Sequence, residues 1–477
     1  MAWIALHYFA VLACSARVLL RPHRDPTARV AWLAVLFAVP VIGVIAYVLL
    51  GEANVGRERA ARMKRIAAEL PPPTSDADAP DPLDGLSQDQ RQYVHLFDVG
   101  QSVSGYAPVG GNRSRLMADA DAAIGEMIAD IDAATDHVHL MFYIWLPDGN
   151  GRKVAEALMR ASVRGVTCRA MVDDIGSRSL IRSGLWSAMD AAGVRLGRAL
   201  KVGNPILRSL SGRIDLRNHR KIVVIDNAIT YCGSQNCADP AFLPKAKFGP
   251  WVDAVMRFEG PVVRQNQHLF ACDWIANTQE DIGDVLRTPP GTTGAGFVAQ
   301  VVASGPIYRY SAMPEMFESL IHAARRSLTI TTPYYVPDPA IQAAFCAAAY
   351  RGVDVTAVFP ERNDDFAVGA TSRSYYRELL AAGVRIHEFR PGLLHAKSVT
   401  VDDEVCLIGS ANMDRRSFDL NFENNILLLD PVQTAAMKRR QQDYIAQSRQ
   451  VTLEEVSAWP WTRRLWNNTL AILGPVL

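Results

Sequence analysis

The first fifty positions of this 477-residue chain are dominated by apolar residues. Ala2 to Leu20 is mostly apolar, and Val30 to Leu50 contains no charged residue. Each run is close to the roughly 20 residues that a helix needs to cross a bilayer. Arg21 to Pro26 is a short polar connection between them. The pattern therefore predicts an N-terminal transmembrane helical hairpin, with helices at about 2–20 and 30–50. A signal peptide, which the lack of a basic region before Ala2 disfavours, and an apolar arm buried in a soluble dimer are the competing interpretations.

A basic flank extends this first region to residue 70. Basic residues stand on both sides of the second apolar run: Arg17, Arg21, Arg24 and Arg29 before it, and Arg57, Arg59, Arg62, Lys64 and Arg65 after it. Such residues orient membrane proteins, but here the two sets nearly cancel, so the sequence assigns no membrane side to the rest of the chain. Residues 71–92 are rich in Pro and Asp, a composition typical of a linker that cannot build a core.

Beyond the linker, the same succession of helical and strand-like segments occurs twice. A helical pattern leads into an apolar strand at Asp130–Trp145 and again at Phe317–Tyr335, and further helix–strand units follow in each half. Helices that alternate with apolar β-branched runs are typical of layered α/β folds. We therefore predict two α/β repeats with mixed sheets, at residues 93–285 and 286–450, packed face to face around one active site. Two independent domains with one site each are the alternative.

Each repeat contains one copy of the motif His-x-Lys-x4-Asp. The two copies consist of His219, Lys221 and Asp226, and of His395, Lys397 and Asp402. Side chains two positions apart on a strand share a face, so each histidine is expected beside its lysine. A neutral imidazole beside a fixed ammonium can attack or receive a phosphate group. Each motif aspartate falls in a predicted turn before a returning strand.

A second echo follows each motif at the same offset, as Gly233-Ser234-Gln235-Asn236 and Gly409-Ser410-Ala411-Asn412. Three other segments stand out: Phe142-Tyr143-Ile144-Trp145, Trp251-Val252-Asp253 and Arg415-Arg416-Ser417. With these segments the chain resembles the phospholipase D superfamily and, within it, the phosphatidylglycerol-dependent bacterial cardiolipin synthases. The resemblance runs almost end to end and includes the N-terminus.

The resemblance implies a role for each residue of the doubled motif. His219 would attack phosphorus and form a phosphohistidine, while His395 would act as general acid and then as general base. These roles require His219 to start neutral and His395 to start cationic. Lys221 and Lys397 would hold the phosphate oxygens. Further hydrogen bonds to the phosphate are expected from Ser234, Asn236, Ser410 and Asn412.

Each histidine also needs an acceptor on its second ring nitrogen to fix its orientation. By sequence the motif aspartates, Asp226 and Asp402, are the obvious candidates, and they complete the catalytic set. In the superfamily, however, the partner is usually an acidic residue on a later strand, and the motif aspartate is more structural. The matching positions here are Asp253 and Glu423, which we expect to orient the histidines.

The implied reaction transfers the phosphatidyl group of one phosphatidylglycerol to another, releasing glycerol and forming cardiolipin. Because the number of phosphodiesters is unchanged, no cofactor and no metal are expected. The expected partners are phosphatidylglycerol, cardiolipin and the bacterial inner membrane, in which the chain would be multi-pass; a homo-oligomer is left open. A hydrolytic phospholipase D, or a transphosphatidylase with another lipid acceptor, is the alternative. A lipid-binding scaffold with a dead site is disfavoured by two intact motifs.

Composition excludes some other classes of protein. The formal net charge of +1 gives no support to bulk nucleic-acid binding, so no nucleic-acid partner is expected. The seven cysteines include no Cys-x-x-Cys pair and have mostly apolar neighbours, which indicates reduced, buried thiols rather than disulfides or a metal site.

Two further segments combine basic and apolar residues. The segment 200–216 lies just before the first motif, and the tail 451–477 contains the run Trp459–Trp466. Either could rest on a membrane surface. A surface loop in the first case, and packing onto the core in the second, are equally compatible with the sequence.

Overall fold

The computed structural model describes residues 2–21, 26–52, 55–73, 81–203, 213, 215–287, 294–307, 309 and 311–472. The chain divides into two compact units. The first comprises residues 1–61 and 202–216, and the second comprises residues 62–201 and 217–475.

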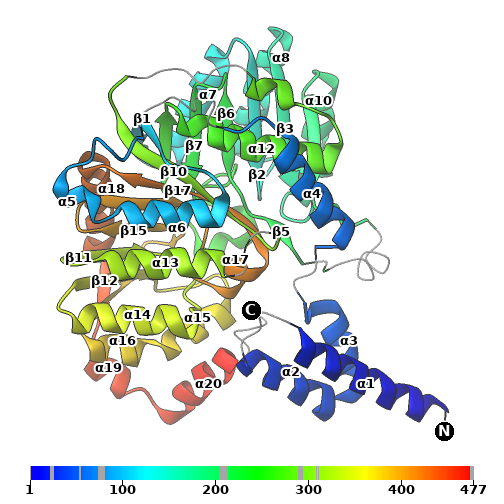
Figure 1. The fold of residues 1–477 in the computed structure, drawn as a ribbon, viewed down its shortest axis with the longest axis vertical. Helices are drawn as coiled ribbons and strands as arrows, with labels where there is room; N and C mark the ends of the chain where they lie inside the picture. Colours follow the sequence, from blue (N-terminus) through cyan, green and yellow to red (C-terminus); the bar gives the residue numbers. More distant parts are fainter. Residues whose placement is uncertain are drawn as a thin grey trace. The chain divides into compact units, whose positions relative to one another are not determined.

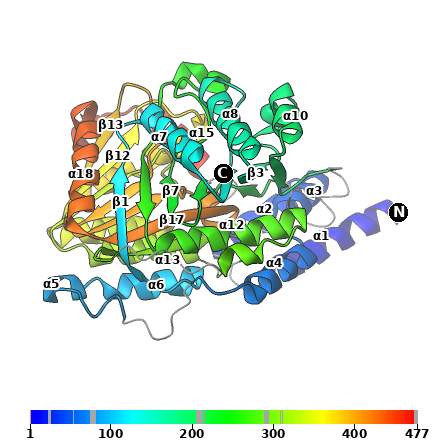
Figure 2. The same cartoon turned by 90° about the horizontal axis from the view of Figure 1, so that it is seen from above.

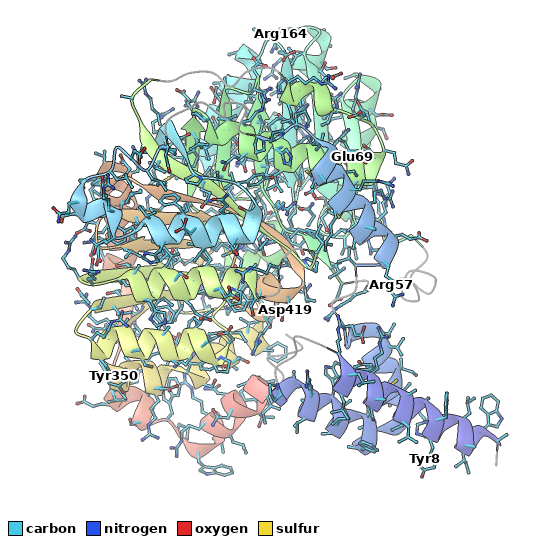
Figure 3. All side chains as sticks on the ribbon, viewed as in Figure 1. Tyr8, Arg57, Glu69, Arg164, Tyr350 and Asp419 are labelled. Carbon is cyan, nitrogen blue, oxygen red and sulfur yellow. The ribbon has the colours of Figure 1, made fainter. Side chains whose placement is uncertain are left out.

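The first unit begins with α1 (Ala2–Leu20), an apolar helix with most of its side chains exposed. Trp3 is 83% exposed, and Tyr8 projects away from the helix (Figure 3). Within the described part of the chain, α1 is the one helix that is long and apolar enough to cross a membrane. The first predicted helix is therefore present with its expected bounds.

The second predicted spanning helix is replaced by two short ones, α2 (Pro26–Ala38) and α3 (Pro40–Leu50). The rings of Trp32 and Tyr47 meet edge to face with centroids 5.3 Å apart, whereas one straight helix would separate these residues by about 22 Å. The chain thus folds back near Val39. Pro40, which cannot donate a helical hydrogen bond, stands at the first turn of α3. The prediction of a single helix over 30–50 was wrong because apolar composition does not reveal such a break.

The described residues of the 200–216 segment from Val202 onward belong to this first unit. Arg213 forms an ion pair with Asp215 and donates a hydrogen bond to the Leu50 carbonyl at the end of α3. Residues 204–212 and 214, on which the expectation for this segment mostly rests, lie outside the described residues.

The second unit starts within α4 (Arg57–Glu69), continues through α5 (Gln88–Arg91) and α6 (Val94–Ser104), and then enters the first repeat. The strands of the first repeat are β1 (Val109–Leu116), β2 (His137–Phe142), β3 (Thr167–Asp173), β4 (Arg195–Ala199), β5 (Arg217–Asn218), β6 (Ile222–Ile225), β7 (Ile229–Gly233), β8 (Trp251–Val252) and β9 (Val255–Glu259). Its helices are α7 (Ala120–Ala133), α8 (Gly149–Val163), α9 (Arg178–Ile181), α10 (Gly184–Ala191), η1 (Leu243–Phe248), α12 (Val262–Thr278) and η2 (Gly283–Leu286).

The second repeat follows the same order. Its strands are β10 (Phe297–Ser304), β11 (Ser327–Thr331), β12 (Asp354–Pro360), β13 (Arg385–Phe389), β14 (Leu393–Leu394), β15 (Ser398–Val401), β16 (Val405–Gly409), β17 (Asn421–Leu429) and β18 (Ser448–Val451). Its helices are α13 (Ala312–Ala323), α14 (Pro339–Tyr350), α15 (Phe366–Ser374), α16 (Tyr376–Ala382), α17 (Arg415–Asp419) and α18 (Pro431–Ala446). The tail that follows forms α19 (Leu453–Ser457) and α20 (Trp461–Ile472).

Both repeats contribute a mixed half-sheet. In each, two parallel strand pairs (β2–β3–β4 and β11–β12–β13) continue into antiparallel ones through the motif strand, β6 or β15. The antiparallel pairing of β1 with β10 then joins the half-sheets into one continuous sheet. The predicted α/β fold with a duplicated repeat is confirmed. The pairing that joins the two halves at an edge was not predicted.

Three apolar cores fill the layers of this unit. α7, α8 and α10 cover the outer face of the first half-sheet, and α13, α14 and α16 cover that of the second (Figures 1 and 2). The third core lies between the half-sheets, where alternate residues of β6, β7 and β9 meet those of β16 and β17. α12 and α18, the long last helix of each repeat, complete this central core.

Candidate active site

The two motif segments meet at crossed strand pairs. β5, just before His219, runs parallel to the start of β17, and β14, just before His395, runs parallel to β8. The His219 amide donates to the Phe422 carbonyl at 2.9 Å, and the His395 amide donates to the Val252 carbonyl at 2.8 Å. Each motif is therefore held by a strand of the other repeat, which brings both motifs into one site.

The same crossing decides which acid serves which histidine. His219 Nδ1 lies 2.8 Å from Glu423 Oε2, and His395 Nδ1 lies 2.6 Å from Asp253 Oδ1. Because an ionised carboxylate only accepts hydrogen bonds, Nδ1 carries the proton in both rings, and Nε2 is left with its lone pair. All four side chains are buried. The acid of each pair comes from the opposite repeat.

The two carboxylates differ in the number of groups they accept from. Glu423 accepts from Ser410, Ser417 and Asn421 as well as from His219. Asp253 accepts from Ser234 at 2.6 Å as well as from His395. The hydroxyl protons of Ser234 and Ser410 are thus directed at the carboxylates, although we expected these serines to bind phosphate.

Each motif lysine donates a hydrogen bond to the backbone of its own histidine. Lys221 Nζ donates to the His219 carbonyl at 2.6 Å, and Lys397 Nζ donates to the His395 carbonyl at 2.7 Å. Burial lowers the pKa of Lys221 to about 8 and that of Lys397 to about 7, although nearby carboxylates oppose the shift. Their charges are therefore sensitive to pH in the neutral range.

Burial also lowers the pKa of both histidines, to about 4 in each case. Lys397 contributes to the shift of the His219 pKa and Lys221 to that of the His395 pKa, so the four groups share one electrostatic site. The opposite starting states expected for the two imidazoles are not present: both pKa values lie well below neutrality. The pKa values of the two carboxylates, Asp253 and Glu423, are also lowered, which keeps both groups ionised. Although burial raises it, the neighbouring His395 and Lys397 lower the pKa of Asp253 to about 2.

The motif aspartates contact backbone amides instead of the histidines. Asp226 accepts from the amides of Thr135, Asp136 and His137, and from the Thr135 hydroxyl. Asp402 accepts from the amides of residues 325, 326 and 327 and from the Tyr93 hydroxyl. Both residues have positive φ, 50° and 52°, in the turn that returns the strand. These are the contacts of turn residues that tie the motif strand to the start of β2 or β11.

The asparagines of the two echo segments contact protein groups, Asn236 on another segment of the chain and Asn412 within its own loop. Asn236 Oδ1 accepts from the Ile144 amide at 3.1 Å, and Asn412 Nδ2 approaches Asp414 Oδ2 at 3.4 Å. Burial raises the pKa of Asp414 to about 6. Within the described ranges, no group of three or more His, Cys, Asp or Glu residues is arranged to hold a metal ion. The seven cysteines are free thiols, and six of them are buried, as predicted.

Some residues of the site were quoted from the sequence without being given a role. The Tyr143 ring packs against His219 with centroids 5.0 Å apart, and the Trp251 ring packs against His395 at 4.5 Å. Ser417 donates to Glu423. Tyr143, Trp251 and Ser417 all stand in the segments that carried the resemblance, so the signal was present, but only the fold shows what they touch.

One buried ion pair was not predicted, although Arg220 stands within the first motif itself. Arg220, the middle residue of the first motif, is fully buried and bonds Asp273 of α12 at 2.7 Å. Arg220 also donates to the carbonyls of Glu423 and Ser304. The second motif has Ala396 at this position, so the strand that carries Glu423 has an anchor that the other half-site lacks.

Comparison with known proteins agrees with this geometry. The family described as "Cardiolipin synthase, PLD-like domain" matches residues 127–249 and 317–444, and the family described as "Phospholipase D-nuclease N-terminal" matches residues 9–52. Cardiolipin synthase A of Salmonella paratyphi B is 37% identical over 489 aligned positions, which cover 100% of this chain and 98% of the relative. This chain belongs to the cardiolipin synthase family of phospholipase D-like proteins. Cardiolipin synthase A of Salmonella newport shows the same identity and coverage.

A solved structure shows that the fold is shared more widely than the sequence. Phosphatidylserine synthase of Haemophilus influenzae superposes with a TM-score of 0.60 at 13% identity, covering 80% of this chain and 100% of that one. At this identity the likeness concerns the fold alone. The family assignment rests on the sequence matches.

Proposed function

We propose that this member of the cardiolipin synthase family transfers the phosphatidyl group of one phosphatidylglycerol to a second one, giving cardiolipin and glycerol. The observation that carries the proposal is the pair of crossed histidine–carboxylate contacts, found in a chain 37% identical to cardiolipin synthase A over its whole length. Two such pairs supply a nucleophile and a proton carrier, which is what exchange at a phosphodiester requires.

In the first step we assign the attack on phosphorus to His219 Nε2. The new N–P bond forms as the bond from phosphorus to the glycerol oxygen breaks, and the departing oxygen takes a proton from His395 Nε2. Glycerol leaves, and the phosphatidyl group stays on His219. Glu423 holds the Nδ1 proton of His219 and stabilises the positive charge that develops on the ring.

In the second step, a hydroxyl of the other phosphatidylglycerol attacks the phosphohistidine. Its proton passes to His395, the N–P bond breaks, and cardiolipin is formed while His219 returns to its starting state. Lys221 and Lys397 would balance the charge on the phosphate oxygens in both steps. With both hydroxyl protons directed at carboxylates, we assign Ser234 and Ser410 to positioning those carboxylates.

The low pKa of His395 requires a source for the proton of the first step. A bound phosphodiester brings one negative charge into this buried site. Because a nearby anion favours the protonated form of an imidazole, substrate binding would load His395 with its proton. Asp253, whose pKa is about 2, remains ionised and stabilises the resulting cation.

We also propose how the chain is organised around this chemistry. Residues 93–285 and 286–450 are the two repeats, residues 71–92 link them to the membrane region, and α1 anchors the protein in the bacterial inner membrane. A second crossing by residues 30–50 is not part of the proposal, because α2 and α3 fold back on each other.

The test uses the full chain in liposomes of phosphatidylglycerol with a chelator present, and follows glycerol and lipid products by mass spectrometry. Equal amounts of cardiolipin and glycerol, absent from His219→Ala, are the expected result. Phosphatidic acid as the main product would make the protein a hydrolase. A product that forms only after another lipid is added would indicate a different acceptor.

A further inference from the structure

The last helix of the chain has its apolar side turned away from the protein. α20 (Trp461–Ile472) packs on α15, where Leu470 joins a small cluster with Ala367 and Ala370 (Figure 1). At about 100° per residue, Trp461, Leu465 and Ile472 fall within about 40° of one another on the opposite side. Their exposed fractions are 68%, 58% and 72%. A surface helix of a soluble protein normally shows the reverse arrangement.

Two further exposed apolar residues belong to the elements that lead from α20 to the catalytic site. Phe366, 74% exposed, begins α15, and Leu243, 71% exposed, begins η1. η1 is tied to the start of α15 by an ion pair between Lys245 and Asp364. We call the exposed residues Leu243, Phe366, Trp461, Leu465 and Ile472 the outer apolar face.

Two ring contacts lead from the start of η1 to His395. Phe242, the residue before η1, stacks on Trp251 with centroids 3.9 Å apart, and Trp251 packs against His395 at 4.5 Å. Leu243 of the outer apolar face thus directly follows the buried Phe242, whose ring packs on the Trp251 wall of the catalytic site. A surface that holds this face would lie beside the half-site of His395.

The charges around the face favour one kind of partner. α20 contains Arg463 and Arg464 and no acidic residue, and η1 contributes Lys247. All three side chains are exposed, and the Arg463 guanidinium lies 3.8 Å from the centre of the Trp459 ring. Tryptophan, aliphatic residues and arginine together are typical of segments at a membrane–water boundary, where the basic groups meet anionic headgroups.

We propose that the outer apolar face inserts into the surface of a bilayer containing anionic phospholipid, as a membrane contact of the catalytic unit separate from α1. The inference rests on the proposed function in that the substrates are lipids of this bilayer. The contact would hold the site wall formed by Trp251 close to the headgroups, so that a phosphodiester reaches His395 without its lipid leaving the membrane.

A fluorescence experiment tests the contact without relying on activity. The chain has nine tryptophans, so the emission of Trp461 is obtained as the difference between the wild type and Trp461→Phe, both reconstituted at full length. In vesicles of phosphatidylglycerol with brominated acyl chains, this difference signal should lose about half of its intensity or more, and acrylamide in the water should quench it weakly. The control is Trp186→Phe on α10, whose difference signal should not respond to the brominated lipid.

Two results of this experiment would overturn the proposal. Quenching of Trp461 by acrylamide alone would place the outer apolar face in water. Protection from both quenchers would mean that protein covers it, and a second copy of the chain would then be the occupant.

A kinetic experiment tests the consequence for catalysis. The triple variant Trp461→Ser, Leu465→Ser, Ile472→Ser should lose about fivefold in turnover on phosphatidylglycerol bilayers and less than about twofold in mixed detergent micelles, where lipid reaches the site without a membrane contact. The control variant is Val163→Ser, Tyr350→Ser, Val432→Ser. These residues are 81%, 72% and 69% exposed on other helices (Tyr350 is labelled in Figure 3), and turnover should be unchanged in both assays.

Unchanged turnover of the first variant on bilayers, or an equal loss in bilayers and micelles, would contradict the proposal. Failure of the proposed function has a different signature, since cardiolipin would then be absent in micelles and bilayers alike while the quenching of Trp461 is unaffected.

Discussion

The two half-sites of this protein look alike in sequence and are built differently in space. Glu423, which serves His219, accepts from four groups, and its strand is anchored by the buried pair of Arg220 and Asp273. Asp253, which serves His395, accepts from two groups, and its histidine packs against Trp251. A nucleophile must be held in one place, whereas a group that carries protons must change its charge. Glu423 is held by more hydrogen bonds than Asp253, which agrees with the roles of nucleophile and proton carrier that we assign to His219 and His395.

Removing either histidine gives the largest effect. His219→Ala and His395→Ala should each lower turnover on phosphatidylglycerol by at least about a thousandfold, since one removes the nucleophile and the other the proton carrier. A phosphatidyl ester of p-nitrophenol separates the two, because this leaving group needs no proton. With it, His395→Ala should accumulate a phosphatidyl adduct in intact-protein mass spectra, and His219→Ala should not. An adduct on His219→Ala would reverse the assignment.

Neutralising the two carboxylates should give losses of the order of a hundredfold that differ in kind. Glu423→Gln weakens the orientation and charge of the nucleophile, so its effect should be similar with glycerol and with p-nitrophenol as leaving group. Asp253→Asn destabilises the protonated His395, so its loss should be large with glycerol and small with p-nitrophenol. The measurement is the rate of the first step, followed as the burst of glycerol or p-nitrophenol in the first turnover, because the second step uses His395 whichever group has left. Identical leaving-group dependence in the two variants would remove the distinction between the half-sites.

The lowered pKa values of the two motif lysines should set the pH dependence of the reaction. Burial lowers the pKa of Lys397 to about 7, so its ammonium is charged below that pH and loses its proton above it. Because the charged form binds phosphate oxygens, kcat/KM should fall up to about tenfold per pH unit above pH 7. Lys221, whose pKa is about 8, should steepen the decline at higher pH. A profile that stays flat up to pH 9, measured with phosphatidylglycerol in micelles, would contradict this prediction.

The motif aspartates should have the smallest effect on activity. Asp226→Asn and Asp402→Asn keep the shape of the side chain but weaken hydrogen bonds to backbone amides, at a cost of about 1–3 kcal/mol in the free energy of unfolding. The loss should be greater for Asp402, which is 1% exposed, than for the partly exposed Asp226. Chemical unfolding measures the stability, and turnover per folded molecule should remain within about threefold of the wild type. A loss near that of the histidine variants would make these residues catalytic.

Much of this architecture could be predicted because the sequence contains the same pattern of segments and motifs in both repeats. The doubled helix–strand pattern predicted the α/β repeats, and the doubled motif predicted which histidines and lysines would meet. These residues were expected on strands, but they lie in the short segments between β5 and β6 and between β14 and β15. The turns at Asp226 and Asp402 were also predictable, because short polar residues tolerate positive φ.

The crossing of the half-sites could not be predicted in this way. Asp253 follows the first motif in the chain but serves His395, 142 positions further on, and Glu423 serves His219, 204 positions back. These partners depend on the pairing of β8 with β14 and of β5 with the start of β17, in which β5, β8 and β14 contain only two residues each. So short a strand leaves no periodic pattern in the sequence. The fold-back between α2 and α3 was missed for a different reason, since uniform apolar composition outweighed the single proline.

Because each repeat supplies the carboxylate for the histidine of the other, separating the two repeats into two polypeptides should have a specific consequence. A chain cut between η2 and β10 would leave His219 with Asp253 on one fragment and His395 with Glu423 on the other. Neither fragment contains a complete histidine–acid pair, so each alone would be inactive in a cell. The two fragments expressed together would restore both pairs.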